Sequence, residues 1–173
     1  MVGGSLGART INRSIQGDLD KLFASDVDVQ VIWQTGRYYH EEALKHLKAY
    51  RGMPIWCSDF ITRMDYAYAA ANLVLSRSGA GTVSELCLVA KPVLFVPSPN
   101  VAEDHQTKNA KALEAKGAAV VVPDAEARTR AMARAMELLA NGEALRRMSE
   151  NLEKLARPDA AERIVDEIEK VMK

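Results

Sequence analysis

A glycine-rich turn between two apolar runs is the feature that most restricts how this chain can fold. The apolar run 73–75 precedes the turn 76–85, Ser-Arg-Ser-Gly-Ala-Gly-Thr-Val-Ser-Glu, and the apolar run 86–90 follows it. This order predicts a short buried strand, a turn and a helix, the arrangement in which α/β proteins bind phosphates. Gly79 and Gly81 allow backbone dihedrals that a side chain would forbid, and they let a ligand approach the amides. The residues expected at this anion site are Ser78, Gly79, Ala80, Gly81 and Thr82.

Glu85 follows Thr82 by three residues, and this spacing is compatible with two roles. A carboxylate repels a phosphate but accepts hydrogen bonds from the hydroxyl pair of a sugar, so a carboxylate beside an amide-rich turn is typical of a nucleotide site. The alternative is a capping box, in which Thr82 caps the helix and Glu85 accepts from the backbone N–H of Thr82. The T-x-x-E spacing does not decide between the two roles.

Short apolar runs alternate with helical stretches from residue 1 to residue 122. The expected strands are the end of one at 1–8 and those at 27–33, 54–57, 73–75, 92–96 and 118–122. This alternation predicts an α/β fold with a doubly wound, Rossmann-like parallel sheet, whose ligands bind at the carboxyl ends of the strands. Because a complete first strand needs apolar residues before Met1, we expect the chain to begin inside a larger protein.

Beyond Pro123 the pattern changes to helices alone, expected at about 125–140, 143–155 and 159–172. Pro158 separates the last of these helices from the rest. Its apolar residues fall on one stripe, made of Ile164, Val165, Ile168, Val171 and Met172. We therefore expect a Rossmann-like domain over 1–157 and, over 158–173, a helix that packs on another domain.

Composition and motifs argue against several classes of function. The 23 basic and 23 acidic residues give a formal net charge of zero, so no nucleic-acid surface is indicated. Metal-binding patterns such as C-x-x-C and H-E-x-x-H are absent from the sequence, and we expect neither a metal nor a cofactor. Neither the turn 76–85 nor the first glycine turn, residues 3–7, is a G-x-x-x-x-G-K-[ST] loop, so a P-loop that hydrolyses ATP or GTP is not indicated. The segment 33–36, Trp-Gln-Thr-Gly, lacks the acidic residue with which dinucleotide folds bind the adenosine ribose.

Five segments in register resemble one family of bacterial glycosyltransferases. They are residues 3–9, 76–85, 91–97, 104–110 and 158–163. This family transfers N-acetylglucosamine from UDP-N-acetylglucosamine to the undecaprenyl-pyrophosphoryl-muramyl-pentapeptide, lipid I, and thereby forms lipid II for peptidoglycan. The resemblance implies a GT-B arrangement of two Rossmann-like domains, of which this chain is the carboxyl-terminal, donor-binding half.

The same resemblance implies what the other half of such an enzyme contributes. That half binds lipid I, supplies the general base and meets the inner membrane, so the full-length protein is expected to be cytoplasmic and peripheral on the inner face of the membrane. The reaction is an inverting, metal-independent glycosyl transfer. The isolated chain is expected to bind the donor without turnover, and no catalytic residue is expected within it.

The resemblance also assigns substrate-binding roles to individual positions. Ala80, Gly81 and Thr82 bind the diphosphate through backbone amides and the Thr82 hydroxyl, and Glu85 accepts from the ribose hydroxyls. The remaining assignments are Phe60 and Ile61 for a uracil slot read by backbone groups, His105 and Gln106 for the sugar hydroxyls, and Ser5 near the diphosphate. Some family members carry a bulkier residue at the position of Gly81 and a glutamine at that of His105.

Several alternatives remain open at this point. Side chains such as Phe60 and Ile61 are more often core residues than base-stacking ones, although a position in a loop after a strand favours a site. His105 is equally typical of a solvated helix start. The sequence also allows two other functions. The chain could be half of a UDP-N-acetylglucosamine 2-epimerase, which has a related two-domain fold, or a nucleotide-binding domain without catalytic activity.

Overall fold

The computed structural model describes residues 1–4 and 6–172. It contains parallel strands that meet in one sheet, with Val2 bridging β1 on one side and β3 on the other. The strands are β1 (Val31–Gln34), β2 (Ile55–Ser58), β3 (Val74–Ser76), β4 (Val93–Phe95) and β5 (Val120–Val121). Counting the Val2 segment first and then the strands along the chain gives the order 3-2-1-4-5-6, which is that of Rossmann folds. The predicted α/β parallel sheet is thus confirmed.

The first strand after the N-terminal segment is shorter than predicted. A strand was expected over 27–33, but β1 begins only at Val31, whose N–H donates to the carbonyl of Pro54 at 2.9 Å. Pro54 comes directly before β2, so the residues that precede Val31 have no neighbouring strand to pair with. In contrast β3 and β4 are buried along their whole length, as expected of strands covered on both faces.

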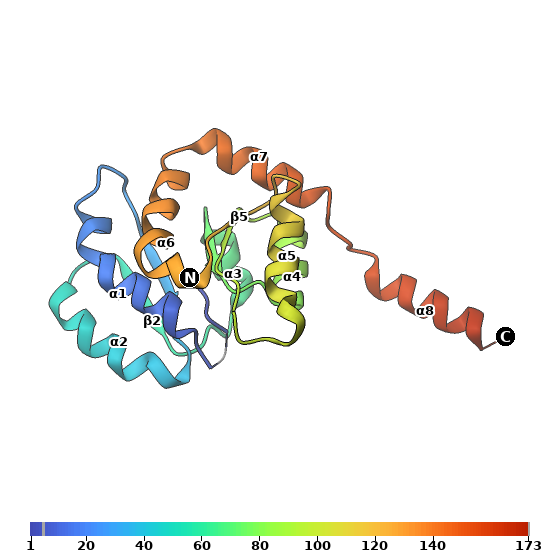
Figure 1. Ribbon diagram of the computed structural model, residues 1–173, viewed down its shortest axis with the longest axis horizontal. Helices are drawn as coiled ribbons and strands as arrows, with labels where there is room; N and C mark the ends of the chain where they lie inside the picture. Colours follow the sequence, from blue (N-terminus) through green and yellow to red (C-terminus); the bar gives the residue numbers. More distant parts are fainter. Residues whose placement is uncertain (5, 173) are drawn as a thin grey trace.

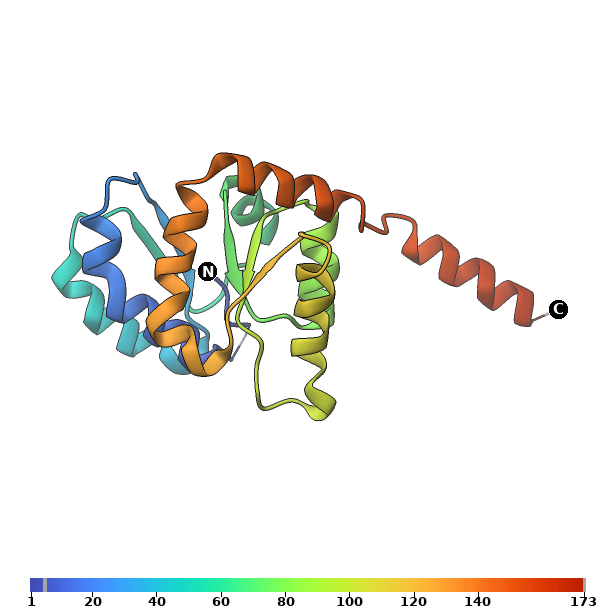
Figure 2. The same cartoon turned by 45° about the horizontal axis from the view of Figure 1, so that its top comes forward.

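Helices cover both faces of this sheet. They are α1 (Arg9–Phe23), α2 (His40–Leu47), α3 (Met64–Ala70), α4 (Ala80–Leu88), α5 (His105–Glu114), α6 (Asp124–Leu139), α7 (Gly142–Glu153) and α8 (Ala160–Val171), with short 3-10 turns at Arg37–Tyr39, Lys48–Tyr50 and Ala102–Asp104. Figure 2 shows α1 and α6 on one side of the strands and α4 and α5 on the other. The buried Ser14 hydroxyl joins the first pair, because it donates to the carbonyl of Ala127 at 3.0 Å.

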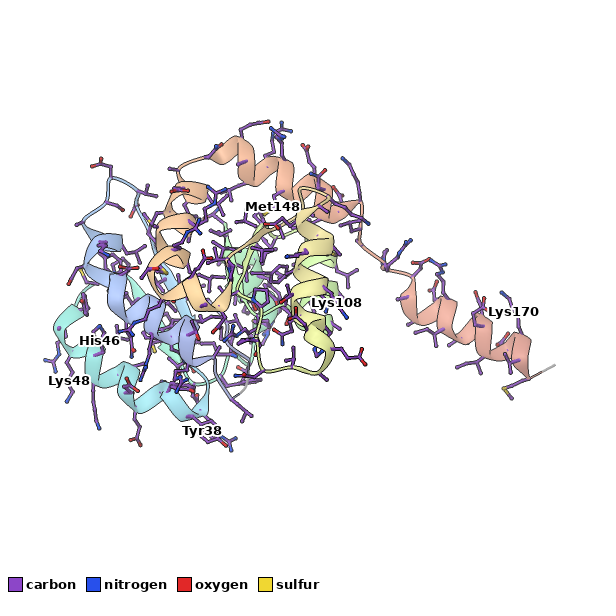
Figure 3. All side chains as sticks on the ribbon, in the orientation of Figure 1. Tyr38, His46, Lys48, Lys108, Met148 and Lys170 are labelled. Atoms are coloured by element: carbon purple, nitrogen blue, oxygen red, sulfur yellow. The ribbon has the colours of Figure 1, made fainter. Side chains whose placement is uncertain are left out.

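Helix α7 closes one end of the sheet and contacts both α4 and α6. Met148 on this helix lies over the strands, where its sulfur accepts from the N–H of Val93 at 3.1 Å (Figure 3). The largest wholly buried side chain is Trp33 on β1, whose indole N–H donates to Asn12 Oδ1 at 2.8 Å. These contacts anchor β1 and β4 in the core, and the carboxyl ends of the two strands lead into the loops described below.

Helix α8 extends away from the body of the molecule (Figure 1). Its apolar stripe is exposed: the exposed fractions are 61% for Ile164, 52% for Val165 and Ile168, 86% for Val171 and 81% for Met172. The helix itself is amphipathic as expected, and its packing partner stays a prediction. Within the described residues, the helices are too short or too polar to traverse a lipid bilayer.

The amino group of Met1 lies inside the sheet, between β1 and β3. It donates to the carbonyl of Ile32 at 2.6 Å. Met1 also lines a cavity of about 370 Å³, whose other lining residues include some from α1 and α6. Burial lowers the pKa of this amino group from 8.0 to about 5. A free amine at this position therefore has to lose its proton when the chain folds near neutral pH.

This burial predicts a pH-dependent stability for a chain that begins at Met1 with a free amine. Between pH 5 and pH 8 the unfolded chain binds the proton and the folded chain does not, so the free energy of unfolding rises with pH by at most about 1.4 kcal/mol per unit. Below pH 5 both states bind the proton, and above pH 8 neither does. Urea unfolding at pH 5.5 and pH 8 measures this rise, and the same chain acetylated at Met1 is the control. Equal pH dependence of the two chains would contradict it.

Candidate functional site

Helix α4 begins at the glycine-rich turn without a side-chain cap. Its first residue is Ala80, and Gly79 is the N-cap with φ −63° and ψ 152°. Since the helix begins two residues before Thr82, Thr82 lies inside its first turn and the capping box with Glu85 is wrong. Within the described part of the chain no side chain caps this helix. The amides of Ala80, Gly81 and Thr82 thus remain for an anion at the positive end of the helix dipole.

The carboxylate of Glu85 is held from outside its own helix. Glu85 is exposed on α4, and its Oε2 accepts a hydrogen bond from the hydroxyl of Tyr68 at 2.9 Å. Tyr68 lies on α3, in the segment that leads into β3. The Glu85 side chain is therefore engaged by a tyrosine and not by the main chain of α4.

Ser78 connects the glycine-rich turn to the start of α5. Its side chain is buried, and its hydroxyl donates to the carbonyl of Gln106 at 2.8 Å. In return, the Asn109 amide donates to the carbonyl of Ser78 at 3.2 Å. The side-chain oxygen of Gln106 accepts from the N–H of Ser98 at 2.9 Å, which leaves Nε2 as the end of this amide that can donate to a bound group. The structure thus places Gln106 beside the turn, and its role toward the sugar hydroxyls stays a prediction.

His105 lies exposed at the beginning of α5. Its Nδ1 is 2.9 Å from the carbonyl of Ala102. A carbonyl only accepts, so Nδ1 carries the proton, and in the neutral ring Nε2 is then an acceptor for a hydroxyl. The two residues before the helix, Glu103 and Asp104, have left-handed φ values of 53° and 52°. They turn the chain sharply into α5 and so determine where His105 lies.

The loop after β2 contains the two residues assigned to a base slot, and their side chains differ in burial. Phe60 is 52% exposed, whereas Ile61 is 7% exposed and lines a cavity of only about 30 Å³. The N–H of Ile61 donates to Gln34 Oε1 at 2.9 Å, and the N–H of Phe60 donates to Asp59 Oδ1 at 2.9 Å. Phe60 is thus the side chain available for stacking. Its carbonyl accepts from the Ser58 hydroxyl at 2.9 Å, and a carbonyl oxygen keeps a second lone pair with which it can read a base.

Gln34 joins this loop to the first glycine turn. It is only 3% exposed at the end of β1, and while its Oε1 binds Ile61, its Nε2 donates to the carbonyl of Gly4 at 3.1 Å. One buried amide therefore sets the distance between two loops at the carboxyl edge of the sheet.

Replacing Gln34 with leucine is expected to lower the free energy of unfolding by about 2 kcal/mol, because two backbone groups lose their partner in a buried place. The amide of Ile61 should also exchange its hydrogen faster, which hydrogen-exchange NMR measures. Gln30→Leu, at an exposed position before the same strand, is the matched control and should leave the exchange unchanged. Unchanged exchange in the Gln34→Leu chain would contradict this role.

A polar cavity of about 420 Å³ opens between the first glycine turn and the loop after β4. Its lining residues are Gly3, Gly7, Ala8, Arg9, Thr10, Tyr39, Arg77, Ser98, Pro99, Asn100, Gln106 and Asp124. Arg77 donates to Asp124 Oδ1 at 2.5 Å and to the carbonyls of Val96 at 2.8 Å and Pro97 at 3.0 Å. Thr10 donates to the other carboxylate oxygen of Asp124 at 3.0 Å. This ion pair ties together the loops that surround the cavity.

Sequence reasoning missed Tyr68, Arg77 and Asp124. Their partners lie far away along the chain and follow no motif spacing. Ser5, which was expected near the diphosphate, lies outside the described residues. Across residues 1–4 and 6–172, His, Cys, Asp and Glu form no group of three or more that is suited to hold a metal ion.

Comparisons with known proteins establish the family of this chain. Residues 1–164 match the family model described as glycosyltransferase family 28 C-terminal domain. Over 145 residues, which are 84% of this chain and 39% of the relative, the chain is 70% identical to the UDP-N-acetylglucosamine--N-acetylmuramyl-(pentapeptide) pyrophosphoryl-undecaprenol N-acetylglucosamine transferase of Parabacteroides distasonis. The chain thus spans well under half the length of this relative.

Solved structures show the same likeness. The crystal structure of Acinetobacter baumannii MurG is 32% identical, with a TM-score of 0.85 over 98% of this chain and 48% of that one. A UDP-N-acetylglucosamine 2-epimerase shares the fold at a TM-score of 0.58 and 19% identity, over 92% of this chain and 39% of that one. Because the family model covers nearly the whole sequence, the chain belongs to the glycosyltransferase family 28 C-terminal domain family.

Proposed function

We propose that this chain is the donor-binding half of an N-acetylglucosaminyltransferase that converts lipid I to lipid II, and that it binds UDP-N-acetylglucosamine at the carboxyl edge of its sheet. The observation that carries the proposal is the arrangement at α4, where uncapped helix amides lie one turn before a carboxylate held by Tyr68. The printed name of the 70% identical relative supports the choice of donor and acceptor.

Each group at this edge takes one part of the donor. The amides of Ala80, Gly81 and Thr82 bind the diphosphate, and Glu85 accepts from the ribose hydroxyls. Phe60 stacks on uracil beside the backbone carbonyls of its loop. His105 Nε2 and the Gln106 amide bind the hydroxyls of the N-acetylglucosamine.

The reaction is an inverting transfer in which an acceptor hydroxyl attacks the anomeric carbon and UDP departs. Negative charge builds on the diphosphate as the glycosidic bond to it breaks. The α4 amides are already oriented toward that charge, so they stabilise the transition state with little reorganisation. The Arg77 guanidinium is paired with Asp124 and acts by holding the surrounding loops.

The remaining partners belong to a domain beyond this chain. That domain binds lipid I, supplies the general base and rests on the inner face of the cell membrane. The exposed stripe of α8 packs on it, because five apolar side chains on one helix face are otherwise left in water. The chain thus divides into a donor-binding part, 1–157, and a docking helix, 158–173.

Calorimetry with the 173-residue chain tests the donor assignment. UDP-N-acetylglucosamine is expected to bind at least about tenfold more tightly than ADP-glucose, a difference of about 1.4 kcal/mol. Backbone NMR shifts on titration should be confined to 78–85, 104–106 and the Phe60 loop. Equal binding of the two nucleotide sugars would contradict the assignment. The epimerase alternative would instead gain support if the full-length protein converted the donor to its 2-epimer without any acceptor.

A further inference from the structure

Tyr68 is a buried phenol aimed at an exposed carboxylate on the neighbouring helix. Its side chain is 8% exposed, and its hydroxyl lies 2.9 Å from Glu85 Oε2. Burial and the hydrogen bond to Glu85 raise the pKa of Tyr68 above its usual value of 10.0. The phenol therefore stays protonated and donates to Glu85 throughout the physiological pH range.

This contact restricts a side chain that would otherwise be free. A glutamate on the exposed face of a helix samples several rotamers, and ordering such a side chain costs conformational entropy. With Oε2 held by Tyr68, the carboxylate group is fixed before any ligand arrives. Oε1 and the second lone pair of Oε2 remain as acceptors, which match the two neighbouring hydroxyls of a ribose.

We infer that Tyr68 is a positioning residue for ribose recognition, which makes Glu85 selective for a nucleotide that carries both the 2′- and the 3′-hydroxyl. This inference rests on the proposed function, since it takes a uridine nucleotide as the ligand of α4. Tyr68 itself does not touch the nucleotide. It acts by holding the carboxylate in the conformation that accepts both hydroxyls.

The test compares UDP with 2′,3′-dideoxy-UDP in calorimetry on the 173-residue chain. Tyr68→Phe removes only the hydroxyl and is expected to weaken UDP binding about tenfold while binding of the dideoxy compound changes less than about twofold. Tyr66→Phe is the matched control, because Tyr66 lies on the same helix and is 64% exposed. It should leave both affinities unchanged.

The outcomes separate this inference from the proposed function. If the unaltered chain binds UDP and the dideoxy compound equally, Glu85 does not recognise ribose and both ideas are wrong. If the unaltered chain discriminates and Tyr68→Phe either keeps that discrimination or weakens both ligands alike, the positioning role is wrong and the donor site stands.

A second measurement covers the case in which Tyr68→Phe does not fold. In the unaltered chain labelled with ¹³Cζ-tyrosine, the Tyr68 resonance is identified by its displacement in Glu85→Ala. Addition of UDP should move this resonance, and addition of the dideoxy compound should not. A resonance that moves with neither ligand, or equally with both, would overturn the inference.

Discussion

Glu85→Ala is expected to weaken UDP binding by the 173-residue chain at least about a hundredfold, while its free energy of unfolding changes by about 1 kcal/mol or less. The loss of affinity follows from removing a carboxylate that accepts from two hydroxyls, since hydrogen bonds to charged groups contribute about 1.5–3 kcal/mol each. The effect on folding is small because Glu85 is exposed and alanine is a good helix former, which offsets part of the cost of leaving the Tyr68 hydroxyl unpaired. Calorimetry measures the affinity and urea unfolding the stability.

Glu42→Ala is the control for this substitution, because Glu42 is exposed on α2 and carries the same charge. It should change neither the affinity nor the stability by a measurable amount. If Glu85→Ala lowered the stability and left UDP binding intact, Glu85 would be only a partner of Tyr68 within the fold. The carboxylate would then have no part in binding the nucleotide.

Arg77→Met is expected to lower the free energy of unfolding by about 3 kcal/mol. The Arg77 and Asp124 side chains are only 17% and 20% exposed, and removing one partner of such an ion pair leaves the other charge without compensation. The carbonyls of Val96 and Pro97 lose their donor as well. UDP-N-acetylglucosamine should bind more weakly too, because the loop after β4 then loses its tie to the glycine-rich turn. Chemical unfolding and calorimetry report the two effects.

The double substitution Arg77→Met with Asp124→Leu should recover part of the lost stability, because no unpaired charge is then left behind. Arg130→Met is the surface control: Arg130 pairs with Glu126 on the outside of α6, where the side chains are 69% and 43% exposed, and such pairs contribute at most about 1 kcal/mol. A similar small loss for Arg77→Met would show that the Arg77–Asp124 pair does not hold the loops together.

The fold was largely predictable from the sequence, because most helices and strands follow from a local pattern of apolar residues and glycines. Apolar runs such as 73–75 and 92–96 became β3 and β4, and the glycine-rich turn led into α4 as expected. The errors lie at boundaries that depend on neighbours. The strand expected from residue 27 starts at Val31, because pairing begins only where β2 runs alongside.

The site was predictable only in part. The amides at the start of α4 follow from a local pattern, whereas the contacts that hold the site join residues 17 positions apart for Tyr68 and Glu85 and 47 apart for Arg77 and Asp124. No sequence spacing encodes such pairs, since they form only when elements that are apart in the sequence pack together. Tyr68 on α3 meets Glu85 on α4, and Arg77 after β3 meets Asp124 at the start of α6. The hydrogen bond from the Ile61 N–H to Gln34 is a further contact of this kind, since the two residues are 27 positions apart, and the role of Ile61 in a uracil slot stays a prediction.

A crystal structure of the 173-residue chain with UDP-N-acetylglucosamine tests the central claim most directly. We expect the diphosphate oxygens within hydrogen-bond distance of the amides of Ala80, Gly81 and Thr82, and both ribose hydroxyls on the carboxylate of Glu85 while Tyr68 still donates to it. A nucleotide bound away from the start of α4, or a Glu85 side chain that makes no contact with the ribose, would contradict the account.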